Sequence, residues 1–354
     1  MRFAPLLVLA LAACGDNYLV PDARHADAAA DAPVDGPFNP PTLFDTGLCV
    51  DQACTQISSD VHTYTPQWAL WSDAATKRRW YYLPPNTKID TTDMDHWQFP
   101  VGTKFWKEFT STDGSGNPVR VETRLEQRIG SGDTAADWFY VAYEWNAAND
   151  DTMAVPMGVM NADGTMHDIP SRVDCKSCHE NLQPTRVLGF GALQLDTAVA
   201  AGGDTNLADL VAAGTLTQNP TGSGAPYFPP QATGDTLAAL GYLHANCGHC
   251  HNPTSAYYAS QTTMSFRLEV ATIGDTAMTP TYLSAVGHVT NTAVNGHDII
   301  IDPGLPDMSV LIDRFEANPT ASNYMMIHMP QLGSEVMDPT ADTTLRAWIT
   351  SITP

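Results

Sequence analysis

The chain has 354 residues, 43% of them hydrophobic, and carries 17 basic against 39 acidic side chains, a formal net charge of -22. This length allows two domains with cores of their own, and no internal apolar run approaches the roughly 20 residues that span a bilayer. The negative charge argues against nucleic acid as a partner. It favours instead a partner protein with a cationic docking surface.

The chain begins with MRFAPLLVLALAACG, whose positive charge, short apolar run and small residues predict a secretory signal over residues 1–13. Its ending LAAC resembles the lipobox of bacterial lipoproteins. That resemblance implies cleavage before Cys14, lipid on Cys14, and an exported protein anchored to a membrane; an ordinary signal with a chance cysteine is the alternative. Residues 14–41 are rich in Ala, Asp and Pro, so we expect a disordered tether.

Cys49 and Cys54 follow, in GLCVDQACTQ. Exported proteins meet an oxidising compartment, so we expect these two cysteines to form a small disulfide loop. Free thiols or metal ligands are the alternative, although the C-x4-C spacing is unusual for a metal site.

From about residue 42 the sequence alternates with period two and is rich in aromatic residues. KRRWYYLP, TKFWKEFTS, PVRVETRLEQRI and DWFYVAYEW read as strands, separated by turn sequences such as TDGSGN. We therefore expect an antiparallel β-rich domain over residues 42–230, with the aromatic residues in its core. Within it, TNLADLVAAG predicts a helix that ends at Gly214.

Two further cysteine pairs, each directly followed by histidine, stand in CKSCH and CGHCH. C-x-x-C-H is the pattern of c-type haem attachment: two thiols add across the vinyl groups of the porphyrin, and the adjacent imidazole lies beneath the iron. Two motifs in an exported chain with no cysteine left over predict two covalently bound haem c groups. Haem 1 would be held by Cys175, Cys178 and His179, and haem 2 by Cys247, Cys250 and His251.

Two other chemistries use similar residues. Zinc could take Cys and His as tetrahedral ligands, and a thioredoxin-like dithiol uses C-x-x-C but has no need of the histidine that follows. His249, between the second pair of cysteines, is expected to be a solvated spacer.

The second motif follows a predicted helix. In GDTLAALGYLHANCGHCH, Leu237, Leu240 and Leu243 share one helical face, and Asp235 is the expected N-cap. MSFRLEV and HDIIIDP, further along, read as short strands.

A last helix is predicted in MDPTADTTLRAWITSITP. Asp338 would cap it and Pro339 suits its first turn. Its apolar face would consist of Leu345, Trp348 and Ile349.

The order of helix, C-x-x-C-H, loops, Met-Pro and terminal helix resembles the class I cytochrome c domain over roughly residues 233–352. The resemblance implies a mostly α-helical domain over residues 231–354 with a short β insertion, and His251 and Met329 as axial ligands of haem 2. Thioether ligation raises the potential and suits an electron carrier. Rival ligands in the same stretch are Met325, Met326, His328 and Met337. The whole chain is thus predicted to be α+β.

Five blocks in order are similar to a family of exported bacterial dihaem proteins, over residues 42–350. They are WALWSDAATKRRWYYLPP, FPVGTKFWKEF, HDIPSRVDCKSCHE, VLGFGALQLD and YLHANCGHCHNP. More loosely, FPVGTKFWKEF followed by strands and DCKSCH is similar to the cytochrome P460-like fold. That likeness implies an open face on haem 1 and a lysine crosslink to the porphyrin, with Lys104 and Lys107 as candidates; solvated strand lysines are the alternative.

The leading hypothesis is a lipid-anchored dihaem c-type cytochrome that transfers electrons outside the cytoplasm. The second is a haem enzyme, peroxidase-like or P460-like, with haem 1 catalytic and haem 2 as the relay. The two differ in the sixth ligand of haem 1, because an open iron face can bind small molecules. Candidates near the first motif are His167, Met153, Met157, Met160 and Met166.

Overall fold

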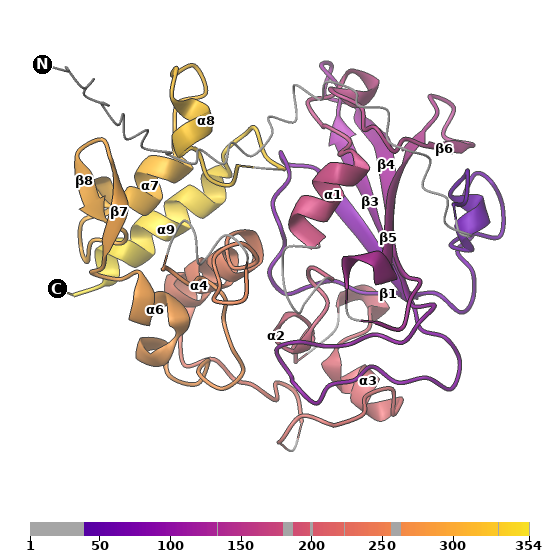
Figure 1. Ribbon diagram of the computed structural model, residues 1–354, viewed down its shortest axis with the longest axis horizontal. Helices are drawn as coiled ribbons and strands as arrows, with labels where there is room; N and C mark the ends of the chain where they lie inside the picture. The colour runs from indigo at the N-terminus through magenta and orange to yellow at the C-terminus, as the bar shows by residue number, and fades with distance from the viewer. Residues whose placement is uncertain are drawn as a thin grey trace, which may run out of the picture. The chain divides into compact units, whose positions relative to one another are not determined.

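The computed structural model describes residues 39–132, 134–179, 187–198, 201–222, 224–255, 263–331 and 333–353 (Figure 1). The chain divides into two compact units, residues 1–39 and 40–354. The predicted signal segment 1–13, the predicted lipidation site Cys14 and most of the predicted tether 14–41 lie outside the described residues. Residues 40–354 combine an antiparallel sheet with helices, which confirms the predicted α+β class.

A six-stranded antiparallel sheet dominates the first part of the unit (Figure 1). Each strand pairs with the next along the sequence, and the four predicted strands are confirmed. The strands are β1 (His62–Thr63), β2 (Thr76–Tyr82), β3 (Lys104–Thr112), β4 (Pro118–Arg128), β5 (Trp138–Trp145) and β6 (Thr152–Ala154).

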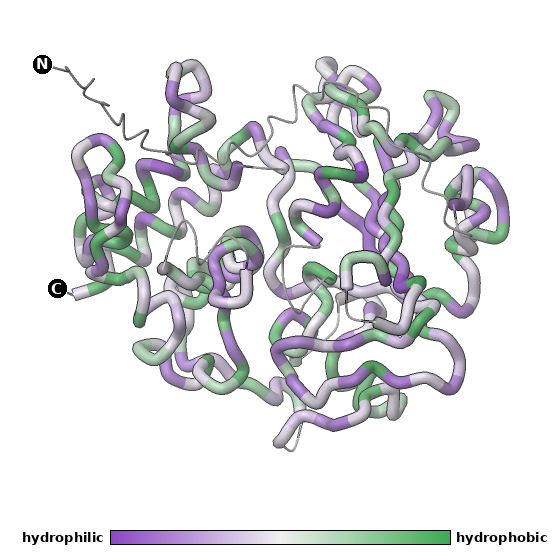
Figure 2. Tube along the Cα trace, in the orientation of Figure 1, coloured by the Kyte–Doolittle hydropathy of each residue, from purple (hydrophilic) through white to green (hydrophobic). Residues whose placement is uncertain are grey.

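One face of the sheet, called the inner face here, carries charged residues among aromatic ones. The register makes Arg79, Lys107 and Arg124 direct cross-strand neighbours, so their side chains lie on the same side. Glu122 and Glu126 flank Arg124 on β4 and share that face. Figure 2 shows the mixture of hydrophilic and hydrophobic residues along the strands. Charges on a covered face are costly unless they are paired.

Helices from later in the chain cover this inner face. α1 (Arg172–His179) contacts β5, and α2 (Ala192–Leu195) lies within the same core. The helix predicted in TNLADLVAAG is confirmed as α3 (Leu207–Ala212), and Gly214 after it adopts a left-handed φ of 65°. The aromatic residues form the core, as expected: Tyr64, Tyr81, Trp97, Phe99, Phe105, Trp138, Tyr140 and Phe190.

The opposite face of the sheet packs against the segment around Thr46. Trp106 Nε1 donates a hydrogen bond to Thr46 Oγ1 at 2.9 Å, and Lys104 Nζ donates to the Thr46 carbonyl at 2.6 Å. Just beyond, Cys49 and Cys54 are joined as a disulfide, with Cα atoms 5.0 Å apart.

The second part of the unit is built on two helices that pack together, α4 (Gly234–Asn246) and α9 (Pro339–Ser351) (Figure 1). The predicted cap of α9 is confirmed, because the Asp338 carboxylate accepts hydrogen bonds from two backbone N–H groups. The predicted cap of α4 is wrong by two residues: Thr233 precedes the helix, and Asp235 lies in its first turn, where its charge still favours the positive end of the helix.

Around these two helices lie shorter elements. HDIIIDP is confirmed in part as β8, which pairs with β7. MSFRLEV, residues 264–270, does not form a strand; Phe266 and Leu268 are buried in the helical core, so their alternation reflects packing against helices. The elements are α6 (Pro280–Ser284), β7 (Val289–Val294), β8 (His297–Ile299), α7 (Val310–Phe315) and α8 (Tyr324–Ile327). Single 3-10 turns occupy Phe44–Thr46, Ala135–Asp137, Ala162–Gly164, Ala201–Gly203, Thr276–Met278 and Pro306–Met308.

Within the described residues, none of the helices combines the length and the apolar character that a bilayer crossing requires.

A segment before β2 contacts the helical part directly. Trp71 Nε1 donates to the Val336 carbonyl at 2.7 Å, and the Asp73 carboxylate accepts the Val336 N–H at 2.7 Å. Trp68 lies against Gly241 of α4, where a Cβ atom would overlap the indole ring. Only glycine leaves room for this contact.

Gly241→Ala is expected to lower the free energy of unfolding by about 1 to 3 kcal/mol, because the added methyl group overpacks the Trp68 contact. Urea denaturation of both proteins measures it. In a Trp68→Ala background the same change should be neutral or stabilising by up to about 1 kcal/mol, since alanine favours helix. Equal destabilisation in both backgrounds would contradict the close contact.

Candidate functional site

The first C-x-x-C-H motif lies on α1. The Ser171 hydroxyl and N–H both donate to the Asp174 carboxylate, at 2.7 and 2.9 Å, at the start of the helix. Arg172 Nε donates to the Tyr140 carbonyl at 2.9 Å, which ties the helix to β5. Cys175 packs against the aromatic core of the inner face. The motif therefore lies on the same face of the sheet as the cross-strand neighbours Arg79, Lys107 and Arg124.

His179, at the end of α1, is oriented by a carboxylate. Its Nδ1 lies 3.2 Å from Glu126 Oε1, and its ring lies 5.2 Å from the Tyr140 ring. Hydrogen bonding through Nδ1 directs the opposite nitrogen, Nε2, to a metal, which is the usual arrangement of a histidine ligand.

The second motif is a tight turn after α4. The His251 N–H donates to the Cys247 carbonyl at 2.9 Å, and Asn252 Nδ2 donates to the Gly248 carbonyl at 2.8 Å. At Gly248 a Cβ atom would come within 2.8 Å of the His244 carbonyl oxygen. The turn therefore needs glycine between the two cysteines.

His251 lies in an apolar environment. Its ring centroid is 5.5 Å from that of Phe266, and its buried Nδ1 has no hydrogen-bond partner among the described residues. Burial, and to a smaller extent nearby Arg314, lower the pKa of His251 to about 4. The imidazole is therefore neutral, the form that binds iron.

The two motifs approach each other. Burial raises the pKa of Cys250 to about 12, and the next contribution comes from the thiol of Cys178 in the first motif. Burial likewise lowers the pKa of His249 to about 4, and His179 of the first motif lowers it further. Charges influence each other this way only over short distances in a protein interior. The two motifs therefore lie within electrostatic range of each other.

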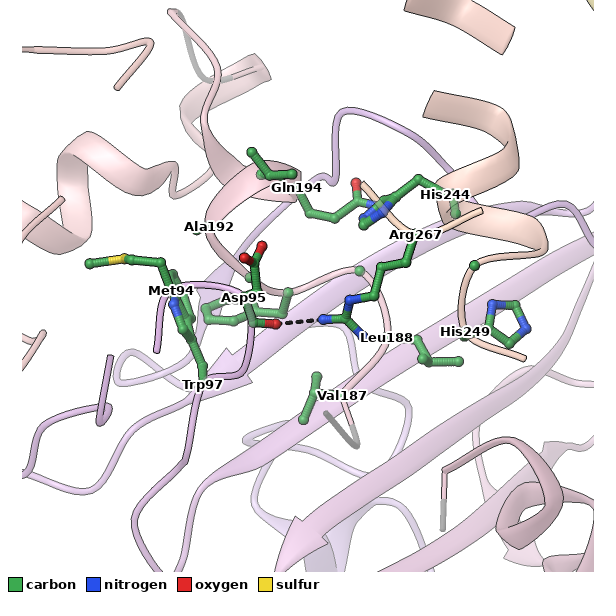
Figure 3. Close-up of a pocket in the computed structure, with 16 residues that line it drawn as sticks. Met94, Asp95, Trp97, Val187, Leu188, Ala192, Gln194, His244, His249 and Arg267 are labelled. Atoms are coloured by element: carbon green, nitrogen blue, oxygen red, sulfur yellow. Dashed lines mark hydrogen bonds between the residues drawn. The ribbon is translucent and has the colours of Figure 1, made fainter. Parts of the chain in front are cut away.

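A cavity of about 70 Å³ opens beside the second motif (Figure 3). His249 and Gly248 form part of its wall, and Arg267 crosses it to donate to the Asp95 carbonyl. His249 is half-buried and lines the same cavity as the loop 187–194, so it is less exposed than the solvated spacer that the sequence predicts.

Two cations line a neighbouring cavity of about 20 Å³ that shares Leu188 and Gln194 with the larger one. Arg79 is buried, and desolvation holds the pKa of Lys107 well below its ordinary value. Among the described residues neither side chain has an ion pair or a hydrogen-bond acceptor; Lys107 only approaches the Phe109 ring, at 5.8 Å.

This unpaired charge fits a porphyrin. Adjacent like charges across strands are destabilising, and a buried cation requires an anionic partner. The two propionates of a haem would supply two such charges at Arg79 and Lys107, and Lys107 lies within the electrostatic influence of Cys178 of the first motif. The residues present therefore fit the group, and sequence reasoning missed Arg79 and Glu126 because charged strand residues read as solvent-facing.

The two lysines that the P460-like resemblance suggested differ in position. Lys104 lies on the opposite face of the sheet, bonded to the Thr46 carbonyl. Lys107 lies on the inner face, within the electrostatic influence of Cys178. Lys107 is half-buried on that face, so it is neither a fully solvated strand lysine nor a fully enclosed one.

The candidates for a sixth ligand at the first motif are occupied or exposed. Buried His167 places Nε2 2.7 Å from Glu122 Oε1 and stacks near the Phe109 ring. The four methionines have exposed fractions between 45% and 71%: Met153, Met157, Met160 and Met166. His167 and these four methionines are therefore poorly placed to act as iron ligands.

At the second motif the Met-Pro stretch offers two ligands. Met329 is half-buried, and its N–H donates to the Arg314 carbonyl at 3.0 Å. Buried His328 stacks on Tyr324 with centroids 4.5 Å apart, and within the described part of the chain neither ring nitrogen meets the geometric criteria of a hydrogen bond. Burial lowers the pKa of His328. His328 is thus a stronger rival than the sequence indicates.

The other rivals are less well placed. Met326 is 71% exposed, and Met337 packs against the hydrophobic core. The side chain of Met325 lies outside the described residues.

Among described residues no group of three or more His, Cys, Asp or Glu side chains is arranged to hold a metal ion. Comparison with known proteins found no matching family model, no matching curated protein and no matching solved structure.

Proposed function

We propose that this protein is a dihaem c-type cytochrome that transfers electrons outside the cytoplasm. The observation that carries the proposal is a pair of cross-strand cations, buried Arg79 and half-buried Lys107, that have no ion-pair partner among the described residues. Lys107 lies within the electrostatic influence of Cys178 in the first motif and of His249 in the second. A covalently bound haem would satisfy both the thiols and these cations. When bound, it supplies a one-electron iron couple.

The residues around the motifs would set the properties of each iron. Cys175, Cys178 and His179 would hold haem 1 against the inner face of the sheet. Cys247 and Cys250 would hold haem 2, with neutral His251 beneath the iron. Because Cys178 and Cys250 influence each other electrostatically, the two porphyrins would lie near enough for electrons to pass between them.

The C-terminal part would be a class I cytochrome c-like domain over residues 231–354, following a β-rich domain over residues 42–230. The packing of α4 against α9 and the short β7–β8 pair support this assignment. Met329 is the proposed second axial ligand of haem 2.

The proposed location rests on residues 1–14, and the proposed partner rests on the net charge. Cleavage before Cys14 and lipid on its thiol would anchor the exported protein to a membrane, outside the cytoplasm. The net charge of -22 would steer the tethered body toward a redox partner with a cationic surface, such as another cytochrome or a haem or copper protein.

A haem enzyme, peroxidase-like or P460-like, is the second candidate. It is favoured by the first motif, where His167 is bonded to Glu122 and the nearby methionines are exposed. An iron face without a protein ligand can bind and activate small molecules. Lys107 lies on the same inner face.

The intact mass of protein matured in a host that attaches c-type haem tests the proposal. We expect the mass of the mature chain plus two porphyrins, and a haem stain that survives a denaturing gel because the attachment is covalent. A chain that carries no porphyrin but binds zinc stoichiometrically would overturn the proposal in favour of the metal-site alternative.

A further inference from the structure

The two histidines of the C-x-x-C-H motifs have different partners at Nδ1. His179 Nδ1 lies 3.2 Å from Glu126 Oε1. His251 Nδ1 is buried and has no hydrogen-bond partner in the described part of the chain. One chain therefore contains a histidine with a carboxylate behind it and a histidine without one.

The register of the sheet fixes Glu126 in this position. Glu126 stands on β4, between its cross-strand neighbours Phe105 and Tyr140. The Tyr140 ring also lies 5.2 Å from the ring of His179. The side chains of His179 and Glu126 are 20% and 12% exposed, so solvent screens their interaction only in part.

A carboxylate behind a histidine ligand changes the iron that the histidine binds. The Nδ1–H group donates to the carboxylate, which makes the imidazole more basic and fixes its orientation. A more basic ligand and a nearby negative charge both stabilise ferric over ferrous iron, and therefore lower the reduction potential. His251, with an apolar ring beside it and no acceptor, lacks both effects.

We infer that Glu126 is a positioning residue that lowers the potential of the iron at His179 below that of the iron at His251. The inference rests on the proposed function and adds a direction to it. With both haems bound, a one-electron donor would reduce the site held by His179, that site would pass the electron to the one held by His251, and an oxidising partner protein would then take it up. The first motif is thus the entry and the second the exit.

A redox titration of the wild-type protein tests the order of the potentials. Two one-haem variants assign them: Cys247→Ser/Cys250→Ser retains only the first site, and Cys175→Ser/Cys178→Ser only the second. We expect the first site to have the lower potential. The reverse order would overturn the inference, while the mass of the wild-type protein, with two porphyrins attached, would leave the proposed function intact.

Glu126→Gln tests the cause. We expect it to shift the first site toward the reduced form by about tenfold or more at a given ambient potential, as second-shell changes commonly do, and to leave the second site unchanged. Glu126→Asp, which keeps the charge, should shift it less. Glu144→Gln is the matched control, because it removes the same charge from the neighbouring strand β5. Equal potentials in Glu126→Gln and wild type, with both porphyrins attached, would refute the role of Glu126.

Discussion

The Met329→Ala variant is expected to convert haem 2 from low spin to high spin. On the proposed assignment, removal of the thioether would leave His251 as the only protein ligand, and a ligand field from one side would no longer pair the electrons of ferric iron. Because axial ligands set haem potentials over about 0.8 V, the potential of this site should also fall, by on the order of 0.1 V. Low-temperature electron paramagnetic resonance and a redox titration measure the two effects.

The matched control is His328→Ala, since His328 precedes Met329 and its ring is buried. Both variants are best made in the Cys175→Ser/Cys178→Ser background, where only haem 2 contributes to the spectrum. A low-spin spectrum in Met329→Ala together with a high-spin spectrum in His328→Ala would identify the histidine as the ligand instead.

Glu122→Ala is expected to lower the free energy of unfolding by about 3 kcal/mol, the low end of the effect of breaking a buried ion pair, because the Arg124 side chain is 29% exposed. Glu122 is fully buried, and its Oε1 accepts from Arg124 Nε at 2.9 Å and lies 2.7 Å from His167 Nε2. The substitution leaves the partly exposed Arg124 guanidinium without its anion. Urea denaturation at neutral pH measures the loss, and Glu144→Ala, half-exposed on the next strand, should change stability by less than about 0.5 kcal/mol.

The pH dependence gives an independent check on Glu122. Burial raises the pKa of its carboxyl, but Arg124 and then His167 outweigh burial, so the pKa lies below its ordinary value. A carboxyl with a lowered pKa in the folded state stabilises the protein above the pKa of the unfolded chain, about 4.3, and loses that contribution as the pH falls. The stability difference between wild type and Glu122→Gln should therefore shrink in acid. A constant difference would exclude an ionised Glu122.

The elements that the sequence predicts well are those with local causes. The alternation in KRRWYYLP and DWFYVAYEW gives strands, and Asp338 followed by proline begins α9. The error at residues 264–270 has a physical reason: burial against helices can produce the same alternation as pairing in a sheet. Alternating hydrophobicity indicates which side chains are buried, but it does not indicate whether a strand or a helix buries them.

The candidate site divides along the same line. The thiols and imidazoles of each motif are adjacent in sequence, so their pattern can be recognised without a structure. The contacts of Glu126 with His179 and of Arg79 with Lys107 depend on sheet register over 53 and 28 residues of chain (179 minus 126, and 107 minus 79). Register depends on the whole set of strand pairs, which explains why these residues could not be chosen from the sequence.

Arg79 and Lys107 on the inner face also bear on how the protein matures. If the proposed haem supplies the anion, a chain that closes around Arg79 and Lys107 without it bears the electrostatic cost of both cations, whereas a chain already joined to a porphyrin would not. Folding and cofactor attachment are then thermodynamically linked, as in any protein whose ligand binds only the native state. The form without haem would have the lower free energy of unfolding and would be degraded faster in the cell. The same two side chains would thus favour the survival of chains that have received their haem.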